Sequence, residues 1–165
     1  MKDTNITTLF SIYLSYPTNR NDKSNFYRQL KNYISIGTEI SAYLIDWEKM
    51  DGFPKMHLYI PAEHEPFVHY AYLSKFITEK EIKAVNNNIV KNCQLLILFG
   101  EYDYEIDNNI KSEVQFANRH DIPIYCMPDL SPEAIQALKL SINLILHSNN
   151  VEDNTEENDE ENTEE

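Results

Sequence analysis

Apolar runs alternate along this chain with stretches whose apolar residues recur at helical spacing. The runs are rich in β-branched and aromatic residues, and they predict strands at residues 8–15, 56–61, 94–99 and 122–127. The segment 94–99 is apolar at every position after Gln94, a pattern typical of strands buried on both faces.

Apolar residues at intervals of three and four predict helices at residues 24–37, 78–93, 107–117 and 131–147. Ser24 and Asp107 are candidate N-caps, and Gly37 is a plausible stop for the first helix. Pro132 suits the first position of the last helix, where a missing N–H costs nothing.

Residues 39–47 fit two patterns. Ile40, Leu44 and Trp47 continue the helical period, whereas Ile40, Ala42 and Leu44 alternate as in a strand, and we favour the strand. The apolar run at 56–61 then either pairs with the strand at 39–47 or forms a strand that does not pair with it.

Alternating strands and helices predict a three-layer α/β domain, in which a parallel sheet has helices on both faces. The chain of 165 residues fits one such domain over residues 1–150. Its three glycines are too few for either the dinucleotide-binding glycine fingerprint or a phosphate-binding P-loop, which excludes both of those classes.

The formal net charge of −13 is concentrated at the C-terminus. Residues 152–165 carry nine acidic residues and no Lys or Arg, and no apolar residue follows Val151. We therefore expect residues 151–165 to form a disordered acidic tail that keeps the protein soluble. The remainder is only mildly acidic, and we expect no binding to duplex nucleic acid.

Two cysteines, Cys93 and Cys126, lie in apolar stretches and are expected to be buried free thiols of a reducing compartment. No apolar run reaches the roughly 18 residues of a membrane span, and residues 1–5 have no signal-peptide pattern. We expect a cytoplasmic protein without a membrane partner.

In an open parallel sheet, ligands bind beyond the carboxyl ends of the strands. This rule selects Ser15 and Tyr16 after the first strand, and Gly100 and Asp103 after the strand at 94–99. Glu113 lies at the flank of the following helix's apolar stripe, where it either reaches this crevice as a desolvated carboxylate or escapes to solvent.

The segment from Cys93 to Gly100, the polar loop, Asp107 followed by Glu113 six residues on, and the strand at 122–125 together resemble the nucleoside 2-deoxyribosyltransferase-like superfamily. The resemblance covers roughly residues 9–127, with 12–15 as the opening strand. It implies a flavodoxin-like parallel sheet and cleavage of an N-glycosidic bond by a glutamate nucleophile.

By that resemblance Glu113 is the nucleophile, and Asp107 and Tyr13 line the substrate pocket. A facing carboxylate stabilises the oxocarbenium-like transition state and traps the sugar covalently, and no cofactor is expected. Asp107 or Asp103 would assist departure of the base, although Asp107 is equally explained as an N-cap.

This chain departs from the family pattern in two ways. No glycine lies between Asp107 and Glu113, which disfavours close approach of a sugar phosphate, and Asn86 stands near a position where the family has an Asp. An amide binds a base or a sugar hydroxyl but cannot act as a base. The family's hexamers complete their active sites with the C-terminus of a neighbouring subunit. The acidic tail of this chain does not resemble such a C-terminus, so the sequence leaves open whether the protein forms a homo-oligomer.

His57, His64 and His69 cluster beside two glutamates, but the spacing 64–69 is one residue longer than H-E-x-x-H, and Pro66 resists the helix such a site needs. We expect no metal. The nearby rings of Tyr59, Phe67, Tyr70 and Tyr72 serve either packing or base stacking.

Two hypotheses of function follow. The first is an enzyme that cleaves the N-glycosidic bond of a nucleoside or nucleotide, or transfers its deoxyribosyl group, through Glu113. The second is a non-catalytic protein of the same fold that binds or sequesters a nucleotide-like small molecule, encoded by a phage or mobile element.

Overall fold

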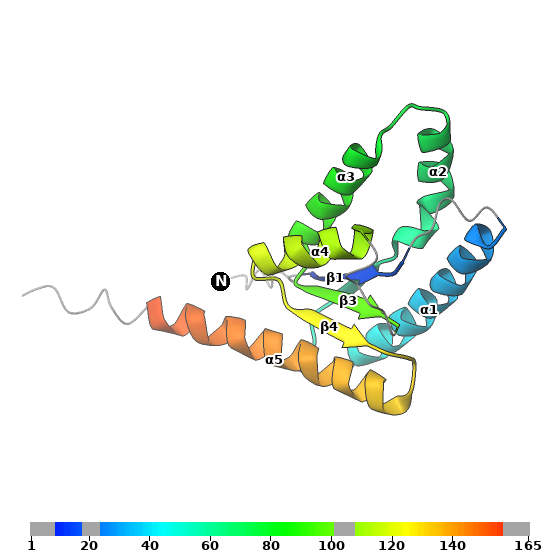
Figure 1. Ribbon diagram of the computed structural model, residues 1–165. Helices are drawn as coiled ribbons and strands as arrows, with labels where there is room; N and C mark the ends of the chain where they lie inside the picture. Colours follow the sequence, from blue (N-terminus) through cyan, green and yellow to red (C-terminus); the bar gives the residue numbers. More distant parts are fainter. Residues whose placement is uncertain (1–8, 18–23, 101–107, 157–165) are drawn as a thin grey trace, which may run out of the picture.

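The computed structural model describes residues 9–17, 24–100 and 108–156. Its centre is a sheet of four parallel strands in the order β2-β1-β3-β4 (Figure 1). The strands are β1 (Phe10–Ser15), β2 (Met56–Tyr59), β3 (Leu95–Phe99) and β4 (Ile124–Met127). All four strands expected from the apolar runs are thus present.

Helices cover both faces of the sheet (Figure 1). The helices are α1 (Phe26–Trp47), α2 (Glu65–Leu73), α3 (Glu79–Lys91), α4 (Asn108–Arg119) and α5 (Pro132–Glu156). One core cluster joins Ile12 and Leu14 to α1 and α5, and a second joins Tyr13 to α3 and α4. Successive β1 side chains thus point to opposite faces, and the expected three-layer, flavodoxin-like α/β fold is confirmed.

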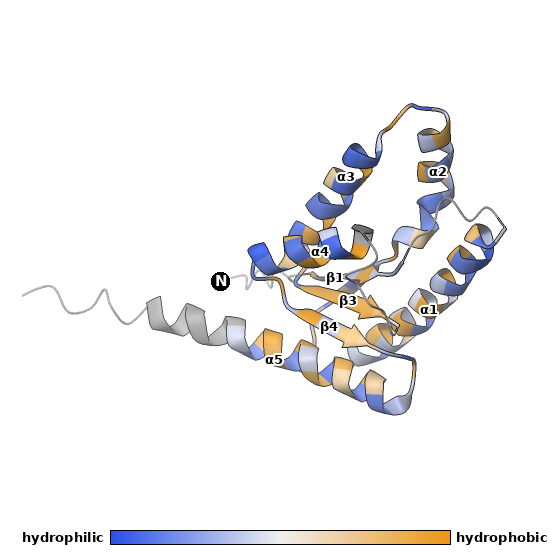
Figure 2. Ribbon diagram, viewed as in Figure 1, coloured by the Kyte–Doolittle hydropathy of each residue, from blue (hydrophilic) through white to orange (hydrophobic). Residues whose placement is uncertain are grey.

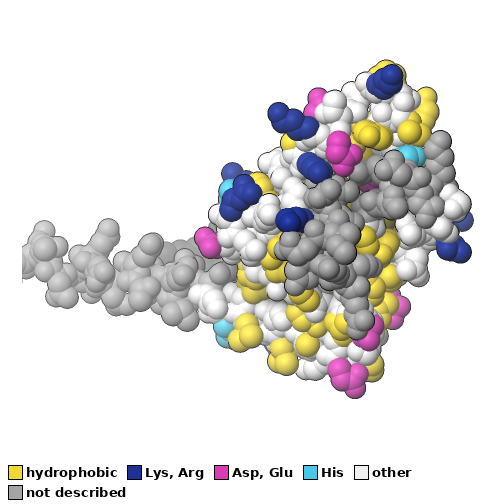
Figure 3. All heavy atoms as spheres, viewed as in Figure 1, with side chains coloured by type: hydrophobic (Ala, Val, Ile, Leu, Met, Phe, Trp, Pro, Cys, Tyr) yellow, Lys and Arg dark blue, Asp and Glu magenta, His cyan; other side chains and the backbone are white. Residues whose placement is uncertain are grey.

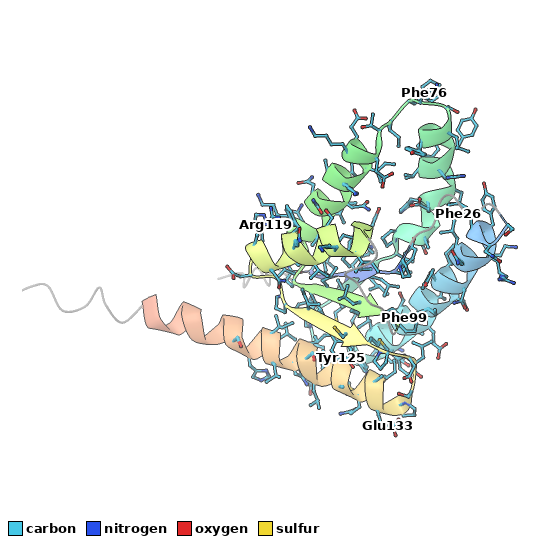
Figure 4. The ribbon with its side chains drawn as sticks, viewed as in Figure 1. Phe26, Phe76, Phe99, Arg119, Tyr125 and Glu133 are labelled. Atoms are coloured by element: carbon cyan, nitrogen blue, oxygen red, sulfur yellow. The ribbon has the colours of Figure 1, made fainter. Side chains whose placement is uncertain are left out.

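Hydropathy follows these layers. The β3 strand is fully buried over its whole length, as its continuous apolar run predicts, and it appears orange in Figure 2. The outward faces of α3 and α4 are largely blue. Helices α2 and α3 extend beyond the sheet and meet through a turn whose tip carries the exposed Phe76 (Figure 4).

The strand favoured at residues 39–47 was wrong, because α1 continues through Gly37 to Trp47. Ile40, Leu44 and Trp47 are buried on one side of the helix, so the helical period holds throughout. Gly37 does not stop the helix. A Cβ atom on Gly37 would lie 2.5 Å from Cδ1 of Ile60, so the glycine permits close packing of α1 on the segment after β2.

Gly37→Ala is expected to destabilise the fold by about 1 kcal/mol, although alanine gains about 1 kcal/mol in helix propensity. The clash with Ile60 outweighs that gain. In an Ile60→Ala background the clash is gone, and the same change should stabilise by about 1 kcal/mol. Denaturant unfolding of the four proteins measures both effects, and an unchanged sign in the Ile60→Ala background would contradict the packing explanation.

Helix starts agree with the sequence to different degrees. Thr78 caps α3, at the start of the helix expected over residues 78–93, since its side chain accepts from the Glu81 backbone N–H while Glu81 accepts from the Thr78 backbone N–H. The N-cap of α1 is Asn25, one residue later than the expected Ser24. The expected cap Asp107 lies outside the described residues.

Helix α2 was not expected, because Pro66 was taken to resist a helix. Pro66 lies in the first turn of α2, where the missing N–H breaks no helical hydrogen bond. Helix α5 ends at Glu156, beyond the expected end near His147, and so takes in residues 151–156. The acidic residues 157–165 lie outside the described residues.

Both cysteines are free, but only Cys93 is buried as expected. Burial raises the pKa of the Cys93 thiol to about 11. The expectation of burial was wrong for Cys126, which is exposed. Cys126 lies on β4, at an edge of the sheet that the described strands form, so an apolar composition there does not ensure burial.

Candidate active site at the carboxyl edge of the sheet

Glu113 is a buried carboxylate beside the carboxyl end of β1, with an exposed fraction of 6%. The Tyr13 hydroxyl donates a hydrogen bond of 2.9 Å to Glu113 Oε1. The Ser15 hydroxyl donates one of 2.5 Å to Glu113 Oε2. Both oxygens of the carboxylate are therefore held by hydroxyls of one strand, about a hundred residues away in sequence.

The sequence explains why these groups meet. Glu113 lies between Ile110 and Ala117 at spacings of three and four, and both neighbours are buried, so Glu113 belongs to the buried row of α4 and not to its edge. Tyr13 and Ser15 are two residues apart on β1 and therefore face the same side of the sheet. That side is the one that α4 covers.

Asn86 joins the same group from α3. Its Nδ2 lies 3.4 Å from Glu113 Oε1, a long hydrogen bond compared with those of the two hydroxyls. Asn86 and Glu113 also line a narrow opening between α3 and α4, together with Lys83 and Ser112. The amide thus reaches from α3 the same carboxylate oxygen that the Tyr13 hydroxyl contacts.

The electrostatics of the site keep Tyr13 protonated. Burial raises the pKa of Tyr13 well above its usual value, and the charge of Glu113 and the hydrogen bond to it raise this pKa further. Tyr13 therefore acts as a donor to Glu113 throughout the neutral range.

Because the pKa of Tyr13 is higher in the folded than in the unfolded chain, Tyr13 contributes stability below pH 10 that is lost as the pH rises further. Replacing Tyr13 with Phe should reduce the loss of unfolding free energy above pH 10 by up to about 1.4 kcal/mol per pH unit. Denaturant unfolding between pH 8 and pH 11 measures this slope, with the exposed Tyr27→Phe as control. Equal slopes for wild type and Tyr13→Phe would contradict the raised pKa.

The other expected site residues are placed differently. Tyr16 points to the opposite face of β1, in the cluster under α1, where its ring stacks on Tyr33 at 4.2 Å. Gly100 follows β3 directly, has a positive φ of 101°, and donates its N–H to the Met127 carbonyl oxygen at 2.8 Å. Asp103 and Asp107 lie outside the described residues.

A mainly apolar recess of about 110 Å³ adjoins this site between α2 and α3. Tyr59, Val68, Ile82 and Asn86 are among its lining residues, so Asn86 borders both the recess and Glu113. The Tyr59 ring stacks on Tyr13 at 5.6 Å and on His64 at 5.6 Å. Phe67 and Tyr70 lie exposed on α2.

Two polar residues that the sequence reasoning considered only for a metal site are buried. Glu65 and His69 are both buried on α2. Their spacing of four residues would indicate a shared helix face, but only if the segment is helical, and Pro66 argued against a helix there.

Lys and Arg side chains gather over α3 and α4 on the face drawn in Figure 3.

Across residues 9–17, 24–100 and 108–156, no group of three His, Cys, Asp or Glu side chains has the arrangement of a metal site. In the same part of the chain, no helix has both the length and the apolar character needed to cross a membrane.

The described chain is thus an α/β protein with a hydrogen-bonded carboxylate buried at the carboxyl edge of a parallel sheet. Comparison with protein-family models, with curated proteins and with solved structures finds no match. The functional argument therefore depends on the residues themselves.

Proposed function

We propose that the protein cleaves the N-glycosidic bond of a nucleoside or nucleotide, or transfers its deoxyribosyl group, with Glu113 as the nucleophile. The observation that carries this proposal is the fixed position of the Glu113 carboxylate, which the hydroxyls of Tyr13 and Ser15 hold at the edge where ligands bind in such sheets. Attack on a sugar carbon requires a carboxylate held in a set orientation.

In the first step an oxygen of Glu113 forms a bond to C1′ of the sugar. The bond from C1′ to the base nitrogen breaks, and its electron pair and a proton from the solvent go to the base. Water or a second base then attacks C1′, gives up a proton to the solvent and releases Glu113 as the carboxylate. The substrate retains its configuration because two displacements occur at C1′.

The surroundings of Glu113 support a nucleoside-like substrate. Asn86 offers an amide to a base or sugar hydroxyl, and the adjoining apolar recess suits a flat heterocycle. Lys83, at the opening beside Glu113, offers a positive charge to the phosphate of a nucleotide. The free thiols of Cys93 and Cys126 favour a reducing, cytoplasmic location.

The test is release of free base from a panel of purine and pyrimidine deoxynucleosides and their 5′-monophosphates, followed by chromatography. We expect turnover of at least one member. Binding of a nucleotide by calorimetry without any base release would replace the enzyme with the non-catalytic binding protein, in which the Glu113 network serves to orient a ligand.

A further inference from the structure

Helix α2 has an apolar outer face. Its one carboxylate, Glu65, is buried, and the helix contains no Lys or Arg. Its exposed large side chains are those of Phe67, Tyr70 and Leu73, which follow one another at intervals of three and therefore share one face. The outer face of an ordinary surface helix is polar, whereas a helix that is apolar on all sides is normally buried. The outer face of α2 is therefore typical of a surface that a partner covers.

Phe76 extends this face beyond the end of α2. Lys75 has a positive φ of 59°, and the Phe76 N–H donates a hydrogen bond of 2.9 Å to the Ala71 carbonyl oxygen. These features hold the backbone of Phe76 at the tip of the turn between α2 and α3 (Figure 4). At such a helix end, the apolar residue after the left-handed one commonly packs back on its own helix. Phe76 is largely exposed instead, so its ring is available to a partner.

The outer face offers enough apolar surface for a stable interface. Its exposed fractions are 77% for Phe67 and Phe76, 65% for Tyr70 and 56% for Leu73. At about 200 Å² for a fully exposed side chain of this size, the four residues present about 550 Å² per copy. Two such faces in contact would bury about 1,100 Å², which exceeds the roughly 1,000 Å² that a specific interface needs.

The distribution of charge favours a second copy of this chain as the partner. The outer face of α2 carries no charge, although the chain has a net charge of −13, and interfaces between identical subunits are the more apolar ones. The strongest acidic run, residues 152–165, begins in the last turns of α5, on the opposite side of the molecule from α2 (Figure 1). Two copies that meet through α2 therefore keep their acidic runs apart.

We propose that the protein forms a two-fold symmetric homodimer through the outer faces of its two α2 helices, each extended by Phe76. The same residues lie on both sides of such an interface, so a substitution in one copy acts twice. The recess between α2 and α3 is separate from this face, because Val68, which lines the recess, lies on the opposite side of α2 from Tyr70. The dimer and the proposed function can therefore be tested independently.

The experiment measures the molar mass of the full chain by sedimentation equilibrium, and circular dichroism of the same samples checks the fold. At about 10 µM the wild type should have twice the 19.4 kDa of one chain. Phe67→Glu and Leu73→Glu each place two like charges in the interface, and each should raise the Kd of the dimer about 100-fold or more. Two variants are used so that a folding failure of one leaves the other to decide.

The matched control is Leu140→Glu, which makes the same change as Leu73→Glu at a leucine of nearly equal exposure on α5. It should dimerise as the wild type does. A wild type that stays monomeric at about 100 µM would overturn the proposal. A dimer that Phe67→Glu and Leu73→Glu leave intact, or that Leu140→Glu weakens equally, would also overturn it, because the interface would then lie elsewhere.

Discussion

Glu113→Gln is expected to lower release of free base by about a thousandfold or more while the fold stays intact. Glutamine has the shape of glutamate but no anionic oxygen to attack C1′. The hydroxyls of Tyr13 and Ser15 can turn to accept a hydrogen bond from the new amide, so the buried network keeps its partners. Steady-state turnover and thermal unfolding of the same preparations measure the two effects.

The matched control for this variant is Glu133→Gln, which makes the same chemical change at an exposed residue of α5. It should leave both turnover and Tm unchanged. A Glu113→Gln protein that retains wild-type turnover would show that Glu113 is not the nucleophile. A loss of activity together with collapse of the fold would point to a structural role for the carboxylate.

Ile97→Ala is expected to destabilise the protein by about 3–5 kcal/mol, a large share of the stability of an ordinary domain. Ile97 lies in the middle of β3, between β1 and β4, with none of its surface exposed. The change leaves a cavity that the surrounding sheet and helices cannot fill by small movements. Denaturant unfolding measures the loss.

The control for this prediction is Leu140→Ala on α5, where 54% of the side chain is exposed. This variant should change the unfolding free energy by less than about 0.5 kcal/mol. A cost at Ile97 as small as that at Leu140 would mean that β3 is not the central strand of the sheet.

The elements predicted best from the sequence are those in which buried positions recur along the whole segment. The run at 94–99 identifies β3, because only a strand covered on both faces needs an apolar residue at every position. Glu113 was a candidate from the sequence because it lies at the flank of an apolar stripe, three residues after Ile110, but the sequence left open whether its carboxylate is buried. The partnership with Tyr13 required only that β1 and β3 be neighbours in a parallel sheet.

The errors arose where a distant contact overrides a local signal. Gly37 resembles a helix stop, but its missing Cβ makes room for Ile60, and no local pattern reveals that contact. Pro66 resembles a helix breaker, but in the first turn it is harmless, so α2 and its buried Glu65 and His69 were missed. Cys126 lies in an apolar segment but is exposed, because that segment is an edge strand of the described sheet. The order of strands in a sheet cannot be predicted from the local sequence.

The central claim is that Glu113 forms a covalent bond to the sugar, and trapping that bond tests it most directly. A deoxynucleoside with fluorine at C2′ slows both displacements by destabilising the oxocarbenium-like transition state, so the intermediate accumulates. Trypsin cleaves after Lys111 and Arg119, and the resulting peptide 112–119 has Glu113 as its only side-chain carboxylate.

We expect mass spectrometry to find one fluorinated pentosyl group on peptide 112–119 of wild type and none on the same peptide of Glu113→Gln. Release of base without an adduct on this peptide, or an adduct on another carboxylate, would contradict the account.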